Sequence, residues 1–267
     1  MAVGGLISRV GLDLAAFRVW ELLRATDLRA RLRNRRVRAL AARELPLPPE
    51  RLIVLVAGSP DLGWFVEGGK RAMESIRGAL ERNGAKLEDM QAVLDFGCGC
   101  GRVLRHCAGL QGPSLFGCDY NPELIAWSRR NLPFASFAVN DITPPLGWPD
   151  DSFDLVWALS VFTHLPEALQ QHWLSELRRV LRPGGYILLT TQGAAYEASL
   201  SSEERAAFQR GELVVRAAGA PGTNLCSAFH PEQYIRERLA PGFDLLEFVP
   251  EGASGNPHQD QILLRKR

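Results

Sequence analysis

The sequence predicts an α/β fold built on a mostly parallel sheet with helices on both faces. Short apolar runs alternate with segments of helical spacing from Ala92 onward, an order typical of such sheets. The first apolar run leads directly into three glycines at alternating positions, Gly97, Gly99 and Gly101. The chain has 267 residues, of which 46% are hydrophobic, and this is enough for one domain of this class with additions.

Turn residues and helix breakers divide the chain into successive elements. Strands are expected where short apolar runs end at turn residues, at 92–96, 114–119, 134–140, 153–159, 186–191, 243–249 and 261–265. Helices are expected where apolar residues recur every three or four positions, at 70–82, 102–108, 122–131, 167–181 and 231–239. Residues 192–240 break the alternation, and we interpret them as an insertion.

The first 49 residues differ in charge from the rest of the chain. Residues 6–43 have helical spacing, and residues 1–45 carry ten arginines and four acidic residues, although the net charge of the chain is only +1. We therefore divide the chain into a basic amphipathic helical extension with a proline-rich linker, 1–49, and a domain at 50–267. The extension fits peripheral contact with an anionic membrane or an acidic partner. It also fits a helix packed on its own domain with solvated arginines.

The composition argues against several classes of protein. The chain has five cysteines, an odd number, and two of them, Cys98 and Cys100, flank a glycine in the turn. A disulfide framework is therefore not expected, and a reducing, cytoplasmic compartment is favoured. No second Cys/His pair stands at zinc-ligand spacing, so no metal site is expected. No apolar run is long enough to span a membrane, and the net charge gives no reason to expect nucleic acid.

Chemically distinct side chains stand at the ends of three successive predicted strands. Asp95 and the glycine turn end the first strand, and Asp119 ends the second. Asn140 and Asp141 end the third. Glycines allow the backbone to turn tightly, a carboxylate accepts hydrogen bonds from a ribose diol, and an amide or carboxylate can reach an adenine amino group. Because the carboxyl ends of parallel strands share one edge of the sheet, these groups together predict a site for a nucleoside-containing cofactor.

The spacing of the glycines distinguishes two cofactors. Dinucleotide-binding turns keep the pattern Gly-x-Gly-x-x-Gly so that phosphates lie on a helix N-terminus. Here the third glycine comes one position early, and Arg102 stands where the last glycine would be. S-adenosylmethionine has no phosphate but has a zwitterionic amino-acid end, which Asp95 and the turn suit. The pattern therefore favours S-adenosylmethionine over a nicotinamide cofactor.

With these motifs the chain resembles the class I S-adenosylmethionine-dependent methyltransferases, in particular the small-molecule branch described as type 11, 12 or 25 methyltransferase domains. Residues 93–102 look like the first motif of that family, 152–156 like its fourth-strand motif, and 180–189 like the helix–turn–strand before its final strands. The resemblance implies a Rossmann-like seven-stranded sheet whose last strand is antiparallel, with S-adenosylmethionine as methyl donor. The cofactor-binding residues that we expect are Asp95, Gly97, Cys98, Gly99, Gly101, Asp119, Tyr120, Asn140, Asp141, Ile142 and Leu159.

Methyl transfer from a sulfonium needs an aligned nucleophile more than a catalytic acid, although a hydroxyl acceptor benefits from a base. His164, just after the fourth strand, and His230, inside the insertion, are the candidate catalytic residues. His258, in the turn between the last two strands, is a further candidate. His164 and His230 also fit structural roles as caps of the helices that follow them.

Several aromatic side chains are candidates for the cofactor or acceptor site. Tyr120 follows the ribose acid and could flank the adenine, and Trp148 could border it. Trp64 and Phe65 could form part of a lid, although core packing is an equal alternative.

The acceptor is predicted only by class. Nothing like the Asn-Pro-Pro-Tyr signature of amine methylation follows the fourth strand, where residues 158–161 read Ala-Leu-Ser-Val. We expect a cytoplasmic enzyme that transfers a methyl group to an oxygen, nitrogen or carbon nucleophile of a small molecule, with residues 192–240 on the acceptor side. The alternatives are a lipid-linked or macromolecular acceptor, and a catalytically silent module that only binds S-adenosylmethionine.

Overall fold

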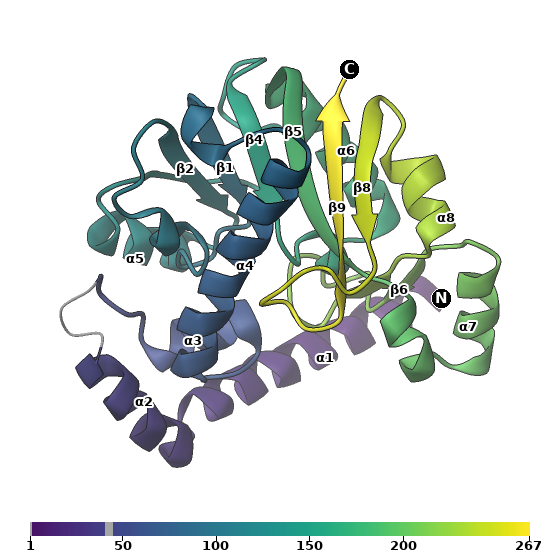
Figure 1. Cartoon of the computed structure of the whole chain (residues 1–267). Coiled ribbons are helices and arrows are strands. Elements are labelled where there is room, and N and C mark those ends of the chain that lie inside the picture. The colour runs from purple at the N-terminus through teal and green to yellow at the C-terminus, as the bar shows by residue number, and fades with distance from the viewer. Residues whose placement is uncertain (1, 41–44) are drawn as a thin grey trace.

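A nine-stranded sheet runs through the part of the chain that the structure describes (Figure 1). The structure, a computed structural model, describes residues 2–40 and 45–267. Five parallel strands follow the order β3-β2-β1-β4-β5. Their bounds are β1 (Ala92–Phe96), β2 (Ser114–Asp119), β3 (Ser136–Val139), β4 (Phe153–Ala158) and β5 (Leu181–Gln192).

The last two strands of the chain complete the sheet, and the final strand runs in the direction opposite to both of its neighbours. β9 (Gln259–Lys266) pairs antiparallel with β5 and with β8 (Phe243–Val249). These seven strands confirm the predicted architecture, including its antiparallel last strand. Two short strands that were not predicted, β6 (Val214–Arg216) and β7 (Ser227–Phe229), form a further antiparallel pair at the end of β5.

Helices cover both faces of the sheet because residues alternate between its faces along each strand. α4 (Leu62–Arg82) and α5 (Pro122–Asn131) share one apolar cluster with Val93. α6 (Glu167–Val180) packs on the other face in a cluster with Leu94. The helix predicted at 231–239 forms one turn of α-helix, α8 (Glu232–Tyr234), followed by the π-helical turn Ile235–Leu239 in that same second cluster.

Two predicted helices differ from the observed ones at their ends. The helix predicted at 102–108 is only a short 3-10 turn, Leu104–Cys107. It lies between Gly101 and Gly109, which both have positive φ angles of 72° and 83°, so the left-handed backbone at either end leaves room for one turn. The helix predicted at 70–82 begins earlier, at Leu62, because the side chain of Asp61 accepts a hydrogen bond from the backbone N–H of Trp64.

The N-terminal extension forms two helices where one continuous helical segment was predicted. α1 (Ala2–Ala25) and α2 (Leu28–Leu40) are separated at Asp27, whose carboxylate accepts hydrogen bonds from the backbone N–H groups of Arg29 (2.8 Å) and Ala30 (3.2 Å). Asp27 therefore caps the second helix and interrupts the first. The last residues of the predicted helical segment, 41–43, lie outside the described residues.

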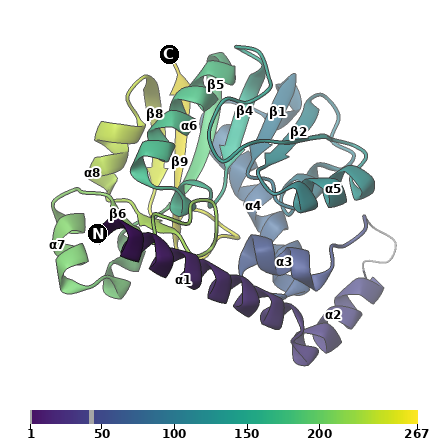
Figure 2. The same cartoon turned by 180° about the vertical axis from the view of Figure 1, so that it is seen from behind.

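The two helices of the extension lie at the carboxyl edge of the parallel strands. Figure 2 shows α1 crossing beneath this edge, from the neighbourhood of α7 (Ser202–Gln209) to α3 (Glu50–Ala57). α2 is tied to the domain by Asn34, which is buried and whose amide donates to the carbonyl of Pro60 (2.8 Å). No helix among the described residues is long and apolar enough to cross a membrane.

Candidate active site

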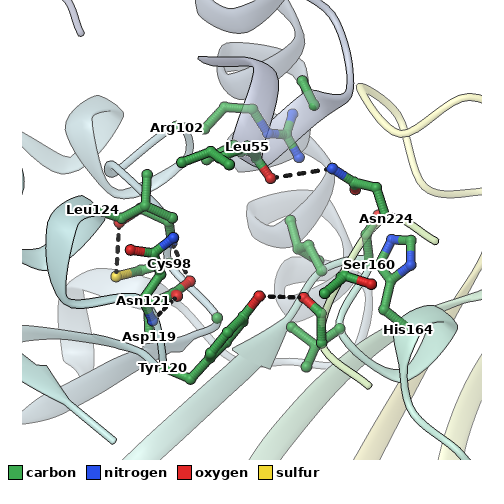
Figure 3. Close-up of a pocket in the computed structure, with 18 of the residues that line it drawn as sticks. Leu55, Cys98, Arg102, Asp119, Tyr120, Asn121, Leu124, Ser160, His164 and Asn224 are labelled. Carbon is green, nitrogen blue, oxygen red and sulfur yellow. Dashed lines mark hydrogen bonds between the residues drawn. The ribbon is translucent and has the colours of Figure 1, made fainter. Parts of the chain in front are cut away.

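A cavity of about 780 Å³ opens at the carboxyl ends of β1, β2 and β4, beneath α1 and α3. This volume lies within the range of small-molecule and cofactor sites. Figure 3 shows Cys98 and Asp119 on one side of the cavity and Ser160 and His164 on the other. The cavity is therefore long enough to separate a cofactor end, near the glycine turn, from an acceptor end, near β4.

The glycine turn between β1 and the following 3-10 turn forms the floor of the cofactor end. Gly97, Gly99 and Gly101 have positive φ angles of 76°, 55° and 72°. A Cβ atom would also collide with a neighbouring side chain at each of them, at Gly97 with Val161 (2.4 Å from Cγ2). These glycines are thus required by the backbone and by the packing of the turn. Gly97 and Gly99 line the cavity, whereas Gly101 does not.

Asp119 holds the glycine turn against the end of β2. One carboxylate oxygen accepts a hydrogen bond from the backbone N–H of Gly99 (3.0 Å), and the other accepts one from the N–H of Asn121 (2.8 Å). Burial raises the pKa of Asp119 to about 6, although these two hydrogen bonds oppose the shift. The carboxylate lines the cavity, as its predicted role as ribose acid requires.

Asp95 and Arg102 place a second pair of charges beside the turn. Burial raises the pKa of Asp95 to about 7, and the charge of Arg102 opposes that shift. The Arg102 guanidinium is itself buried, with its pKa lowered to about 10 by burial. It bonds to the side-chain oxygen of Asn256 and lies over the Trp64 ring at 5.0 Å. The sequence analysis gave Arg102 no role, although its place directly after the turn was visible.

The residues predicted on the adenine side gather at the ends of β2 and β3. Tyr120, Asn140, Asp141 and Ile142 all line the cavity. The side-chain oxygen of Asn140 is buried and forms no hydrogen bond with any described residue, so it is an acceptor without a donor. The Tyr120 hydroxyl donates across the cavity to the carbonyl of Gly222 (2.9 Å) (Figure 3).

His164 lies at the acceptor end, in the 3-10 turn Phe162–His164 after β4. Its Nδ1 lies 2.7 Å from the carbonyl oxygen of Cys226. Since a carbonyl only accepts, Nδ1 carries the proton, and Nε2 keeps its lone pair. Nε2 bonds to none of the described residues. Burial lowers the pKa of His164, so the imidazole is neutral and able to accept a proton near pH 7.

The structure places the other candidate histidines away from the cavity lining. His230 is fully buried, with Nε2 3.0 Å from the side-chain oxygen of Gln170, and burial lowers its pKa to about 3. His258 is exposed and bonds to Glu251 (2.8 Å). Neither residue lines the cavity, although Asn256 and Pro257 beside His258 do.

The aromatic candidates divide between the cavity and the core. Trp64 lines the cavity, whereas Phe65 is fully buried in the apolar core. Trp148 packs edge-on against Phe116 and Phe153, with ring centroids 6.2 and 5.3 Å apart, and does not line the cavity. Trp148 therefore does not lie where it could border the adenine, contrary to the expectation from the sequence.

Ser160 is a cavity residue that the sequence analysis missed. It has a positive φ angle of 58°, uncommon for a residue with a side chain. Its hydroxyl donates to the side-chain oxygen of Gln259 (2.9 Å) and accepts from the amide of Asn256 (3.1 Å). No sequence signal marks such a backbone conformation at a serine, because the network that holds it joins the turn after β4 to the start of β9 and the loop before it.

Two segments far apart in the sequence cover the cavity. Leu14, Phe17 and Arg18 of α1 line it from one side. Gly222, Thr223 and Asn224, within residues 217–226, line it from another, and Asn224 donates to the carbonyl of Leu55 in α3 (3.2 Å). The insertion and the N-terminal extension thus both contribute to the lining of the cavity.

Comparison with known proteins agrees with this geometry. A crevice at the carboxyl edge of a parallel sheet, with a glycine turn after the first strand and an acid after the second, is a site suited to a nucleoside-containing cofactor. Residues 94–189 match the family model described as a methyltransferase domain. These residues, about a third of the chain, are therefore similar to a methyltransferase domain.

Individual proteins share this domain at modest identity. The 2-methyl-6-phytyl-1,4-hydroquinone methyltransferase of Synechocystis is 35% identical over 100 residues, 36% of this chain and 30% of that protein. The probable tocopherol O-methyltransferase of Oryza sativa is 33% identical over 108 residues, 38% of this chain and 29% of that protein. The chain thus spans under a third of the length of these curated relatives.

Solved structures share the fold. A methyltransferase of Mesorhizobium loti described as S-adenosylmethionine-dependent superposes with a TM-score of 0.55 at 17% identity, over 72% of this chain and 98% of that one. One of Methanosarcina mazei, also described as dependent on this cofactor, gives a TM-score of 0.52 at 23% identity, over 70% of this chain and 96% of that one.

Proposed function

We propose that the protein methylates an oxygen, nitrogen or carbon nucleophile of a small molecule, with S-adenosylmethionine as methyl donor. The observation that carries the proposal is one continuous cavity with Asp119 and the glycine turn at one end and the unpaired Nε2 of His164 at the other. This arrangement supports a donor site and an acceptor site that face each other across the end of β4.

The side chains of the cofactor end suit the chemistry of S-adenosylmethionine. The carboxylate of Asp119 would accept from the ribose hydroxyls, and the unpaired oxygen of Asn140 would accept from the adenine amino group. Asp95 would face the ammonium of the amino-acid end and Arg102 its carboxylate, opposite charges in both pairs. When bound, the cofactor supplies a methyl group already activated by the positive sulfonium.

The acceptor end supplies a base and a restricted space. The Nε2 of His164 accepts the proton of a hydroxyl or protonated amine, while the carbonyl of Cys226 keeps the ring in the required tautomer. Leu14, Phe17 and Leu55 add apolar walls that exclude water. Orientation and exclusion of water are the main contributions that a protein makes to an in-line displacement.

The walls of the cavity favour an acceptor with an apolar part. The compounds in the relatives' printed names have such a part: a phytyl hydroquinone, a tocopherol and, in Mycolicibacterium smegmatis, a fatty acid.

We propose that the activity is cytoplasmic, that α1 and α2 make peripheral contact with anionic lipid, and that nucleic acid has no role. Buried free cysteines at all five positions fit a reducing compartment.

Calorimetry with S-adenosylmethionine is the first test, and Asp119→Asn is its diagnostic variant. The variant keeps the size of the side chain but removes its charge, so we expect about 10- to 100-fold weaker binding. Asp89→Asn, at an exposed site in the 3-10 turn before β1, should bind as the wild type does. Unchanged affinity in Asp119→Asn would remove the proposed donor site.

A transfer assay with radiolabelled cofactor then tests the reaction. Phenols, fatty acids and hydroxylated amphiphiles are offered as acceptors to the wild type and to Asp119→Asn. We expect label to move to at least one of them in the wild type only. Tight cofactor binding without transfer to any acceptor would favour the silent binding module.

A further inference from the structure

α1 turns charged as well as apolar side chains toward the cavity and leaves large apolar side chains exposed on its other face. Two of the three charged residues between Leu14 and Ala25, Arg18 and Glu21, line the cavity. On the opposite face, Val19, Trp20 and Leu23 are 55%, 41% and 65% exposed, and Arg24 lies over the Trp20 ring at 4.8 Å. An ordinary surface helix turns its apolar face inward. The outer face of α1 is therefore built to meet an apolar phase.

α2 extends this apolar surface and surrounds it with positive charge. Leu28 and Leu32 are 71% and 60% exposed. The exposed arginines of α2 around them are Arg29, Arg31, Arg33, Arg35 and Arg36. None of these five forms an ion pair with any described residue. An apolar strip bordered by unpaired arginines, with a tryptophan beside it, is the pattern of helices that lie in the interface of anionic membranes.

The part of α1 whose side chains the structure describes, from Leu14 to Ala25, has few buried contacts with the domain. Among its residues from Leu14 to Ala25, only Ala25 is buried. Its polar link to residues 217–226 is the contact between the Asn224 amide and Glu21, at 3.5 Å. Few buried contacts allow an element to move at low cost in free energy. α1 can therefore leave the cavity when its outer face gains a better environment.

We propose that the outer faces of α1 and α2 dock on an anionic lipid bilayer, and that docking opens the cavity toward the membrane so that an amphipathic acceptor enters from the lipid. The second half of this inference rests on the proposed function, because it names where the acceptor comes from. A second copy of the chain is a poorer occupant, since the arginines of two facing copies would repel each other. A nucleic acid is a poorer occupant, since it offers no apolar phase to Val19 and Leu23.

Flotation of the full chain with lipid vesicles tests the docking. At low salt we expect binding to vesicles of phosphatidylcholine mixed with phosphatidylglycerol, and little binding to pure phosphatidylcholine. The doubly charge-reversed Arg35→Glu/Arg36→Glu should bind at least about 25-fold more weakly, about fivefold for each positive charge lost. Leu23→Ser should bind about tenfold more weakly, because it loses a buried leucine side chain in the lipid.

Matched controls separate the surface from general effects. Arg130→Glu changes an exposed arginine on α5, and Leu246→Ser changes an exposed leucine on β8. Both should bind vesicles as the wild type does. Equal binding to neutral and anionic vesicles, or equal loss in the controls, would overturn the proposal. The proposal would also be overturned if light scattering showed that the wild type is a dimer and that Leu23→Ser dissociates it. Binding of the wild type to duplex DNA but not to vesicles would overturn it as well.

Hydrogen exchange tests the opening of the cavity. With anionic vesicles, amides of α3 and of residues 217–226 should exchange faster, because α1 no longer covers them. Unchanged exchange in these segments would overturn the opening. Calorimetry with S-adenosylmethionine on the same variants distinguishes this failure from failure of the proposed function, since Leu23→Ser and Arg35→Glu/Arg36→Glu leave every cofactor-end residue in place.

Discussion

His164 carries its proton on Nδ1 because the carbonyl of Cys226, in the insertion, lies 2.7 Å away. A residue 62 positions further along the chain thus decides which ring nitrogen faces the acceptor. Lowering of its pKa by burial keeps the ring neutral at physiological pH. The neutral side chain can therefore act as a general base when the acceptor carries a proton to remove.

Replacement of this base should separate turnover from cofactor binding. We expect His164→Gln to lower kcat about 100-fold or more with a hydroxyl acceptor, because a glutamine can donate to Cys226 but cannot take up a proton. Its affinity for S-adenosylmethionine by calorimetry should change less than about twofold.

The pH dependence of kcat gives an independent test of the role of His164 as a base. In the wild type, kcat should rise with pH through a value below the ordinary pKa of histidine and then level off. His172→Gln, at an exposed site on α6, is the matched control and should keep the wild-type profile. A wild-type kcat in His164→Gln would show that the acceptor needs no base.

At the scale of elements, the glycine turn is fixed by its contacts with the protein as well as by its proximity to the ligand. A Cβ atom at Gly101 would lie 2.3 Å from the Leu132 Cδ1, and Leu132 is fully buried after α5. Gly101 does not line the cavity, so its requirement is structural. Packing of α5 and the shape of the cofactor end are thereby linked.

Two alanine substitutions separate backbone strain from crowding. Gly101→Ala should lower the free energy of unfolding by about 2–4 kcal/mol, from its left-handed backbone and from overpacking against Leu132. Gly109→Ala has a similar φ angle, 83°, but nothing within 4 Å of the added Cβ, so it should cost about 1 kcal/mol. Chemical denaturation measures both. Equal losses in the two variants would contradict the crowding at Gly101.

At the scale of the whole molecule, buried carboxylates make stability depend on pH. The folded pKa of Asp95, about 7, lies above its value of about 3.9 in the unfolded chain. The folded state therefore binds the proton more tightly between these values. The contribution of Asp95 to stability is full below pH 4 and is lost as the pH rises through 7. Asp119, with a pKa of about 6, acts in the same direction.

Asp95→Asn should therefore stabilise the folded protein at alkaline pH. At pH 8 the variant avoids a buried charge and should gain at most about 4 kcal/mol, whereas at pH 4 it should match the wild type. Thermal unfolding at the two pH values measures the difference. Asp89→Asn is the exposed control and should show no such trend. If Asp95→Asn stabilised the folded protein equally at both pH values, the titration of Asp95 would be ruled out as the cause.

Local signals in the sequence determined the parallel sheet and the cofactor end. Apolar runs indicated the core strands, and Gly97, Gly99 and Asp119 stand between the start of β1 and the end of the next strand, β2. Their spacing alone brings them to one edge of the sheet, because parallel strands end together. The short turn at 104–107 and the break at Asp27 depend on backbone conformation and capping, which periodicity does not report.

Only the tertiary structure decided the acceptor end. The tautomer of His164, the burial of His230, the strained backbone of Ser160 and the inward charges of α1 all depend on contacts between segments 60 or more residues apart. Such contacts follow from how the extension and the insertion pack over the sheet, and no local pattern of residues encodes that packing. The same packing turned an apolar helix face to the outside, which the helical spacing of the extension could not orient.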